Sequence, residues 1–466
     1  MYQPTRASLR MHALPAWFDD AKLGIFVHWT PAAVPAWAPL TGPLHEVIAR
    51  RGWRYWFAHN PYAEWYANTM RIAGSPTQQH HYQTYGRAFP YEAFVPTFKA
   101  AHAHWKPADW AAIFAEAGAR YVVFVTKHHD GFLMWPSRHP NPRHPTYHAE
   151  RDLVGELADA VRSIGLYFGV YYSSGLDWTF NNHLIQDLPD LIAAIPRQAE
   201  YATYVEAHWR ELIARYHPSI LWSDIAYPAG ADVNRLFADY YNAVPEGVVN
   251  DRFAQFNLGA EGSLRERVVL SAVRLGARLS RLTGALSSPS SQTHADFLTP
   301  EYATPSRILA KKWETCRGMG YSFGYNQQEN DSYLISPAAL IHLLVDVVSK
   351  NGNLLLNVGP TAEGMIPEAQ LGRLRVLGGW LKVNGEAIYG TRPWQRAEGL
   401  TADGTPVRFT CRGDVLYVIV MGAAQPGPLT IRQLSAAPNS TVSLLGGPSD
   451  LPWAQAGNDL AITLPP

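Results

Sequence analysis

The sequence predicts an α/β protein, a (β/α)8-like (TIM-type) barrel followed by a small all-β sandwich domain. Strand-like and helix-like segments alternate from Leu23 to Gly359, which is typical of βαβ units. The strand candidates number roughly eight, the count that such a barrel needs. Beyond Pro393 the pattern changes to short strands separated by Gly and Pro. We therefore expect a catalytic barrel over residues 1–392 and a β-sandwich over residues 393–466.

The strand candidates of the barrel are mostly apolar runs without strict alternation. Such runs are typical of parallel strands that are covered on both faces. They are Leu23–Trp29, Tyr121–Val125, Leu166–Ser173, Ser219–Asp224, Val248–Arg252, Ala295–Tyr302, Gly320–Asn326 and Asn353–Gly359.

Helices between these strands have recognisable start and stop signals. Pro107 begins one helix and Gly118 ends it, as both residues commonly do. Asp152 precedes a second helix, whose apolar residues recur on one face. Ser336 begins a third, which stops at Asn351. Each is expected to pack outside the sheet.

The C-terminal strand candidates are short and contain few clustered ionisable groups. We expect an antiparallel sandwich that serves packing, with sugar binding as the alternative. The candidates are Val407–Cys411, Val415–Met421, Leu429–Leu434, Thr441–Leu445 and Leu460–Leu464.

A long insert, about residues 253–295, interrupts the alternation of strand and helix candidates in the barrel. Its Arg-rich middle, Ser263–Leu286, carries apolar residues near heptad spacing, so an amphipathic helix is expected. The helix has three candidate placements, namely docking on its own barrel, a subunit contact, or a lid over the site. Its expected apolar stripe is Leu264, Val268, Leu275, Leu279 and Leu282.

Composition narrows the class of ligand. The 39 basic residues balance 39 acidic ones, so nothing favours nucleic acid or an anionic membrane surface. A neutral substrate is expected, and the 16 Trp and 24 Tyr residues suit stacking and hydrogen bonding to a hydroxyl-rich sugar.

Compartment is predicted from the cysteines and the N-terminal region. Cys316 and Cys411 are too few for a disulfide scaffold, although their pairing stays open. No secretory signal or membrane-spanning run is seen. We therefore expect a cytoplasmic protein.

Polar side chains follow successive strand candidates, where barrel strands meet around one funnel. His28 follows the first strand, and His128 and His129 follow the second. Asp224 ends the fourth strand two residues after Trp222, so both can face the same space. The others are Tyr171, Arg252 and Glu301.

Two of these groups are carboxylates on different strands. Retaining glycoside cleavage needs one carboxylate as nucleophile and one carboxyl as proton donor, about 5 to 5.5 Å apart. Asp224 is the candidate nucleophile and Glu301 the candidate acid/base. Two strand exits of a barrel can supply this arrangement.

A catalytic metal is the disfavoured alternative. Adjacent residues on a strand point to opposite faces, so His128 and His129 cannot readily share one ion. The first strand offers only His28 followed by Trp29, without a second nearby histidine. We expect no metal and no cofactor.

Motifs throughout the barrel make the chain resemble the α-L-fucosidases of glycoside hydrolase family 29. Ten motifs carry the resemblance, and their combination is specific where each alone is weak. They are WFDDAKLGIFVHW (17–29), EWYANTM (64–70), TKHHDGFLMW (126–135), GVYYSSGLDW (169–178), LWSD, VNDR, TPEY, SFGYN, SKNGNLLLNVGP (349–360) and WLKVNGEAIYGTRPW (380–394).

The resemblance implies a retaining exo-hydrolase that removes terminal α-L-fucose through a covalent intermediate. Its nucleophile would be Asp224 in the W-x-D motif, and its acid/base Glu301 in the T-x-E-Y motif. Glu261 and Glu266, inside the insert, are the fallback acid/base candidates. By the same likeness, the fucose-binding positions are His28, Glu64, Trp65, His128, His129, Tyr171, Trp222 and Arg252.

Two other functions stay open at this point. One is a fucose-binding protein without hydrolytic activity, and the other is a metal-dependent barrel hydrolase. The expected partner is a fucosylated oligosaccharide or glycoconjugate, with no nucleic acid and no membrane, and a homo-oligomer is an option.

Overall fold

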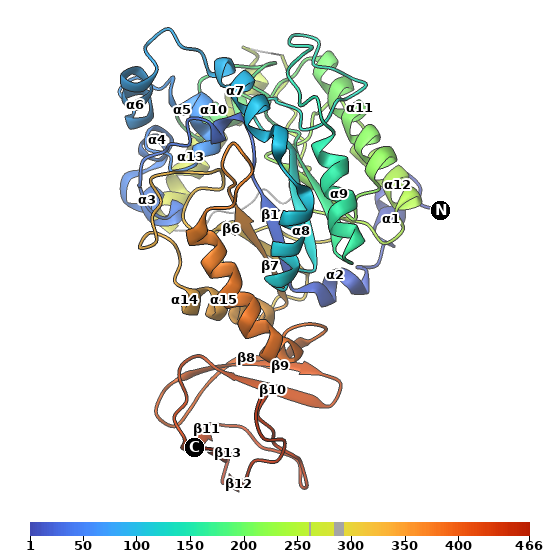
Figure 1. The fold of residues 1–466 in the computed structure, drawn as a ribbon. Helices are drawn as coiled ribbons and strands as arrows, with labels where there is room; N and C mark the ends of the chain where they lie inside the picture. The colour runs from blue at the N-terminus through green and yellow to red at the C-terminus, as the bar shows by residue number, and fades with distance from the viewer. Residues whose placement is uncertain (261, 284–292) are drawn as a thin grey trace.

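The computed structural model describes residues 1–260, 262–283 and 293–466. In the insert helix it describes side chains as far as residue 276. Its centre is a curled parallel sheet (Figure 1) with the strand order β5-β4-β3-β2-β1-β7-β6. The strands are β1 Leu23–Val27, β2 Tyr121–Lys127, β3 Tyr167–Ser173, β4 Ile220–Asp224, β5 Val248–Val249, β6 Trp313–Gly318 and β7 Gly352–Val358.

The segment 297–301 occupies the sixth strand position along the chain, between β5 and β6, without forming a continuous strand. Parallel bridges join Phe297 to Asn250 after β5, and Leu298 to Trp313 in β6. A further bridge joins Glu301 to Cys316. The predicted (β/α)8-like barrel is therefore confirmed, with a loosely paired sixth position.

One strand prediction is wrong. The segment 320–326 is an irregular loop, and the strand before β7 is β6, Trp313–Gly318. This strand was missed because Glu314 and Arg317 break its apolar pattern. The loop is held by Glu329, which accepts hydrogen bonds from the backbone N–H of Tyr321 at 2.7 Å and of Ser322 at 2.9 Å.

The three helices with explicit start signals are confirmed as α8 Pro107–Glu116, α9 Leu153–Ser163 and α14 Pro337–Ser349. The Asp152 carboxylate caps α9 by accepting from Gly155 N–H. The other helices are α1 Arg6–Leu9, α2 Ala16–Ala21, α3 Leu44–Arg51, α4 Trp53–Ala58, α5 Tyr66–Thr69, α6 Pro76–Thr84, α7 Phe94–Ala101, α10 Leu188–Ala193, α11 Ala199–Tyr216, α12 Val233–Ala243, α13 Leu264–Thr283 and α15 Glu368–Asn384.

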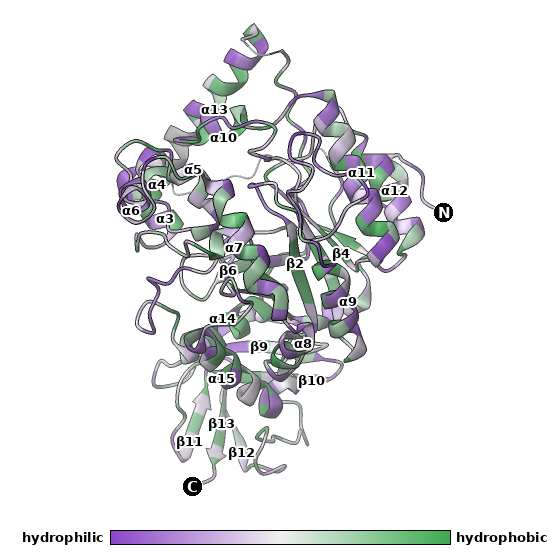
Figure 2. Ribbon diagram, turned by 45° about the horizontal axis from the view of Figure 1, so that its top comes forward, coloured by the Kyte–Doolittle hydropathy of each residue, from purple (hydrophilic) through white to green (hydrophobic). Residues whose placement is uncertain are grey.

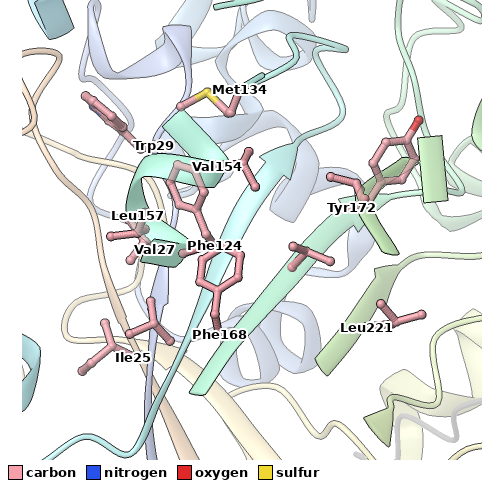
Figure 3. Close-up of a cluster of buried hydrophobic side chains, with 14 of the residues drawn as sticks. Ile25, Val27, Trp29, Phe124, Met134, Val154, Leu157, Phe168, Tyr172 and Leu221 are labelled. Carbon is pink, nitrogen blue, oxygen red and sulfur yellow. The ribbon is translucent and has the colours of Figure 1, made fainter. Parts of the chain in front are cut away.

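The alternation of side chains along the strands separates an outer core from the barrel interior. Val27, Phe124 and Phe168 face outward and pack with Val154 and Leu157 of α9 (Figure 3). Strand residues of the opposite parity belong to the inner cluster. Among them are Phe26, Val123, Tyr171 and Trp222. Strand parity therefore decides which side chains can reach a site inside the barrel.

The C-terminal part forms two three-stranded antiparallel sheets, as the predicted sandwich requires. Sequence reasoning missed β8 and β12, and Thr441–Leu445 is not a strand. Arg408 of the first sheet contacts Asp346 of α14 at 2.6 Å, so the sheet of β8, β9 and β10 rests on the base of the barrel (Figure 1). The strands are β8 Arg392–Leu400, β9 Pro406–Arg412, β10 Val415–Val420, β11 Gly427–Ile431, β12 Trp453–Ala456 and β13 Asp459–Leu464.

The insert forms the expected helix, α13, which lies beside α10 at the end of the molecule away from the C-terminal sheets (Figure 2). The predicted contact stripe is wrong for the described side chains, because Leu264, Val268 and Leu275 are 78%, 59% and 58% exposed. The opposite face, with Val269, Leu270 and Val273, packs on the inner cluster. Leu279, Leu282 and Leu286 lie outside the described side chains.

Cys316 lies in β6 and Cys411 in β9, and both are free thiols. Among the described residues, no helix is long and apolar enough to cross a membrane.

Candidate active site

A single pocket at the carboxyl ends of the barrel strands, with a cavity volume of about 170 Å³, contains the predicted residues. All ten predicted side chains line it, although they come from widely separated parts of the chain. They are His28, Glu64, Trp65, His128, His129, Tyr171, Trp222, Asp224, Arg252 and Glu301.

Asp224 is held from several sides at the end of β4. Its Oδ2 accepts a hydrogen bond from the Tyr171 hydroxyl at 2.8 Å. Its Oδ1 accepts from Arg252 at 2.8 Å and from the Ile225 N–H at 2.9 Å. Ile225 has a φ of 64°, a left-handed conformation that is strained for a β-branched residue. These donors fix the carboxylate without covering it.

Glu301 lies at the bridge between segment 297–301 and β6. Its Oε1 accepts from the Tyr62 hydroxyl at 2.7 Å, and its Oε2 accepts from Arg252 at 3.2 Å. The following residue, Tyr302, also has a positive φ of 50°. The Glu301 side chain is half-buried, so it meets both the pocket and solvent.

Arg252 joins the two carboxylates. One terminal nitrogen of its guanidinium contacts Asp224 and the other contacts Glu301. The guanidinium also lies over the Trp222 ring, 4.6 Å from its centroid. Burial alone would lower the pKa of Arg252, but the charge of Asp224 and other negative neighbours raise it well above its usual range. One fixed positive charge therefore holds both acids at the same site.

The three histidines of the pocket are neutral. Burial lowers the pKa of His28 to about 4, and it lowers the pKa of His128 and His129 well below the usual range. His28 contacts Asn357 at 2.6 Å, and His129 contacts Ser173 at 2.6 Å. The buried Nδ1 of His128 has no hydrogen-bond partner among the described residues. Neutral imidazoles of this kind suit hydrogen bonds to sugar hydroxyls.

Both His128 and His129 reach the pocket because β2 ends at Lys127 and the chain then turns, with the Gly131 N–H donating to the His128 carbonyl at 3.1 Å. The alternation of a strand no longer separates the two rings, and their centroids lie 4.0 Å apart. Lys127 itself faces away from the pocket and forms a fully buried ion pair with Asp177 at 2.8 Å. The polar residues that end β2 are therefore divided between the site and its support.

Glu64 comes from a short 3-10 helix, Ala63–Trp65, in the long segment after β1. Its buried carboxyl accepts the Gly324 N–H at 2.7 Å. Burial raises the pKa of Glu64 from 4.5 to about 8, so the group is mostly protonated at neutral pH. A protonated carboxyl can donate a hydrogen bond to a ligand.

Sequence reasoning missed several polar residues at the site, among them Asn60, Tyr62 and Glu314. Tyr62 lines the pocket beside Glu301, and its position in the run NPYAEWY next to Glu64 was the available signal. Glu314 lies beneath the pocket, where it accepts from the Trp222 indole at 3.1 Å and from the Tyr121 hydroxyl at 2.5 Å. A charged residue within an otherwise apolar strand could have marked it.

The fallback acid/base candidate that the structure describes, Glu266, lies elsewhere. Glu266 does not line the pocket, and it pairs with Arg197 at 2.5 Å and accepts the Gly262 N–H. These contacts tie the start of α13 to the chain after α10. Glu261 lies outside the described residues.

One group of described residues has the spacing of metal ligands, namely His12, His294 and Asp296. None of the three lines the pocket. Asp296 already accepts hydrogen bonds from Tyr241 at 2.8 Å and from the Val249 N–H at 2.7 Å. We therefore regard this cluster as a link between the N-terminal segment and the barrel.

The fold and the pocket define a barrel glycoside hydrolase, because two carboxylates face one cavity rich in aromatic and neutral polar groups. Comparison with known proteins identifies the family. The family model for α-L-fucosidase matches residues 1–269 and 281–386. The chain belongs to the α-L-fucosidase family, glycoside hydrolase family 29.

Individual relatives cover nearly the whole chain. It is similar to an α-L-fucosidase of Branchiostoma floridae, with 30% identity over 100% of this chain and 92% of that protein. It is similar to the human tissue α-L-fucosidase, with 30% identity over 100% of this chain and 88% of that protein. The crystal structure of Thermotoga maritima α-fucosidase with a mechanism-based inhibitor matches with a TM-score of 0.84 and 40% identity, over 100% of this chain and 96% of that one.

Proposed function

We propose that this protein hydrolyses terminal α-L-fucosyl linkages of oligosaccharides or glycoconjugates, with Asp224 as nucleophile and Glu301 as acid/base. The observation that carries the proposal is the single guanidinium of Arg252, which contacts both carboxylates inside one pocket. Such neighbouring acids suit double displacement with retention. No metal or cofactor enters the reaction.

In the first step, an Asp224 oxygen forms a bond to the anomeric carbon of fucose while the bond to the leaving oxygen breaks. Glu301 donates its proton to that oxygen. In the second step, Glu301 takes a proton from water, whose oxygen attacks the anomeric carbon and releases the Asp224 carboxylate. The sum of both steps is addition of one water across the glycosidic bond.

The buried groups of the pocket suit one monosaccharide. The neutral histidines and the protonated Glu64 offer donors and acceptors to hydroxyl groups. The stacked rings of Tyr171 and Trp222, with centroids 5.5 Å apart, offer apolar surface. Because the buried floor closes the pocket, we expect removal of terminal residues only.

The stereochemistry of the first product tests the proposal. We expect 4-nitrophenyl α-L-fucoside to yield α-fucose first, with slower mutarotation to the β anomer, as followed by proton NMR. Immediate release of β-fucose would mean inversion and would exclude Asp224 as a covalent nucleophile. A panel of fucosyl linkages would then define the preferred glycan.

Two measurements separate the alternative functions. Activity that survives EDTA would remove a metal-dependent hydrolase. Binding of fucose without turnover of the nitrophenyl fucoside would instead indicate a non-hydrolytic binding protein. The presence of both carboxylates in the pocket favours hydrolysis.

We also propose the division into residues 1–392 and 393–466, supported by a separate apolar cluster around Val407, Phe409 and Leu460. We propose packing as the main role of the C-terminal sheets.

The two free thiols support a reducing, cytoplasmic location, which cell fractionation would test. Sedimentation analysis would test for a homo-oligomer.

A further inference from the structure

The pocket has two chemically different zones. Most of its lining side chains are buried, and we call these buried residues the floor; they include His28, His128, His129, Glu64 and Asp224. The half-buried side chains form its mouth, and apart from Arg252 and Glu301 all of them are apolar. We call these apolar residues the rim, and they are Leu44, Trp53, Leu191 and Ile225.

The position of Glu301 indicates that the rim contacts the leaving group. Under the proposed function, on which this inference rests, Glu301 protonates the oxygen of the leaving group. The leaving group must therefore extend from the buried floor toward the half-exposed side of the pocket. There it contacts Leu44, Leu191 and Ile225. The charged side chains on this side of the pocket are Arg252 and Glu301.

We propose that the rim is an aglycone-binding site for a leaving group with an apolar face, such as an aryl group or the apolar face of a hexose, and that α13 positions it. The rim buries apolar surface of the leaving group, which favours binding by the hydrophobic effect. Trp53 adds an aromatic ring suited to stacking. A highly charged leaving group has no partner on this rim.

Helix α13 contributes through the elements it packs against. It lies against α10, which carries Leu191, and against α3, which carries Leu44. Its residues Val269, Leu270 and Val273 belong to the same apolar cluster as Leu44, Trp53 and Leu191. These three positions fall on one helical face.

An ion pair fixes the beginning of α13. Arg197, a few residues after α10, contacts Glu266 in the first turn of α13 at 2.5 Å. The insert therefore holds two walls of the mouth, and none of its described residues lines the pocket. A positioning role of this kind predicts that α13 affects leaving-group binding more than fucose binding.

Two substrates separate these effects. In α-L-fucosyl fluoride the leaving group is one atom and cannot fill the rim, whereas 4-nitrophenyl α-L-fucoside places a ring there. We expect Leu191→Ser to lower kcat/KM for the nitrophenyl fucoside about tenfold, with little change for the fluoride. Val273→Ser, which acts through α13, should give a smaller selective loss of about threefold.

The outward face of α13 supplies the matched control. Leu275 is exposed on the same helix, so Leu275→Ser should change neither substrate. The inhibition constant of free fucose should be unchanged in every variant, which would show an intact floor. If Val273→Ser does not fold by circular dichroism, Val273→Ala replaces it.

Each outcome decides the inference. Selective loss on the nitrophenyl fucoside in both variants supports it. No loss in either variant, or equal losses on the two substrates, overturns it. If the wild-type protein hydrolyses neither substrate, the proposed function itself fails, and this result is distinct from the others.

Discussion

The floor and the rim of the pocket are built in different ways. Floor residues such as Trp222 and Asp224 extend from barrel strands, and their polar groups are mostly held by hydrogen bonds. Rim residues such as Leu44 and Leu191 come from short helices and have no polar groups. The difference indicates that hydrogen bonds hold the proposed catalytic groups in place, whereas apolar side chains, most of them from helices, would contact the leaving group.

Loss of the proposed nucleophile, a floor residue, should lower activity more than any other change. We expect Asp224→Ala to reduce kcat by roughly 10⁴-fold or more, because the proposed covalent intermediate forms on Asp224 while Glu301 serves as the acid/base. Steady-state hydrolysis of nitrophenyl fucoside measures this. Added azide should restore turnover with inverted configuration, and unchanged activity would contradict the assignment.

Loss of the proposed acid/base should depend on the leaving group. We expect Glu301→Ala to cost roughly 10²- to 10⁴-fold for a natural fucosyl linkage, and less for nitrophenyl fucoside, whose leaving oxygen needs little protonation. The ratio of kcat/KM for the two substrates is the measurement. Glu266→Ala serves as the control, since Glu266 lies outside the pocket. Equal losses on both substrates would point to another acid.

Floor and rim also differ in how much of each could be predicted from sequence. Asp224 and Trp222 were predictable because strand parity and strand ends are visible as apolar runs. Glu301 was likewise predicted from its place near the end of a strand candidate, Ala295–Tyr302. Glu64 lies in a 3-10 helix after β1, and only the family resemblance indicated it.

The rim was not predictable, and neither was β6. Leu44 and Leu191 meet through tertiary packing of helices that are distant in the sequence. In β6, Glu314 interrupts the apolar run because its carboxylate accepts hydrogen bonds inside the barrel. The contact face of α13 was misjudged because the helix has apolar residues on two faces, and packing on α10 decides between them.

The buried carboxyls of the floor predict a pH-dependent stability that the rim cannot cause. Burial raises the pKa of Glu64 from 4.5 to about 8. The folded state therefore holds a proton that the unfolded state has lost between these two values. The stabilisation is complete below about pH 4.5 and is lost as the pH rises through about 8, with a slope near 1.4 kcal/mol per pH unit for this group.

Denaturant unfolding at pH 5.5 and pH 8.5 measures this slope. Glu64→Gln should reduce the difference between the two free energies of unfolding, because Gln does not titrate and can still accept the Gly324 N–H. Burial also raises the pKa of Glu314 and Glu329 to about 7, so part of the slope should remain. An identical slope in wild type and variant would contradict the protonated state of Glu64.

The smallest effect concerns the rim residue next to the nucleophile. Asn adopts the left-handed conformation more readily than Ile, so Ile225→Asn should raise the free energy of unfolding by up to about 1 kcal/mol. Leu44→Asn is the matched control, because Leu44 has no positive φ and should gain nothing. Thermal unfolding compares the two. A destabilised Ile225→Asn would show that apolar contacts of Ile225 outweigh its backbone strain.

Covalent labelling would identify the nucleophile of the protein. The protein should react with 2-fluoro-fucosyl fluoride, and intact mass spectrometry should show the addition of one fluorofucosyl group. Peptide mapping should place that group on Asp224, and Asp224→Ala should not be labelled. A label on any other residue, or turnover without a covalent species, would contradict the account.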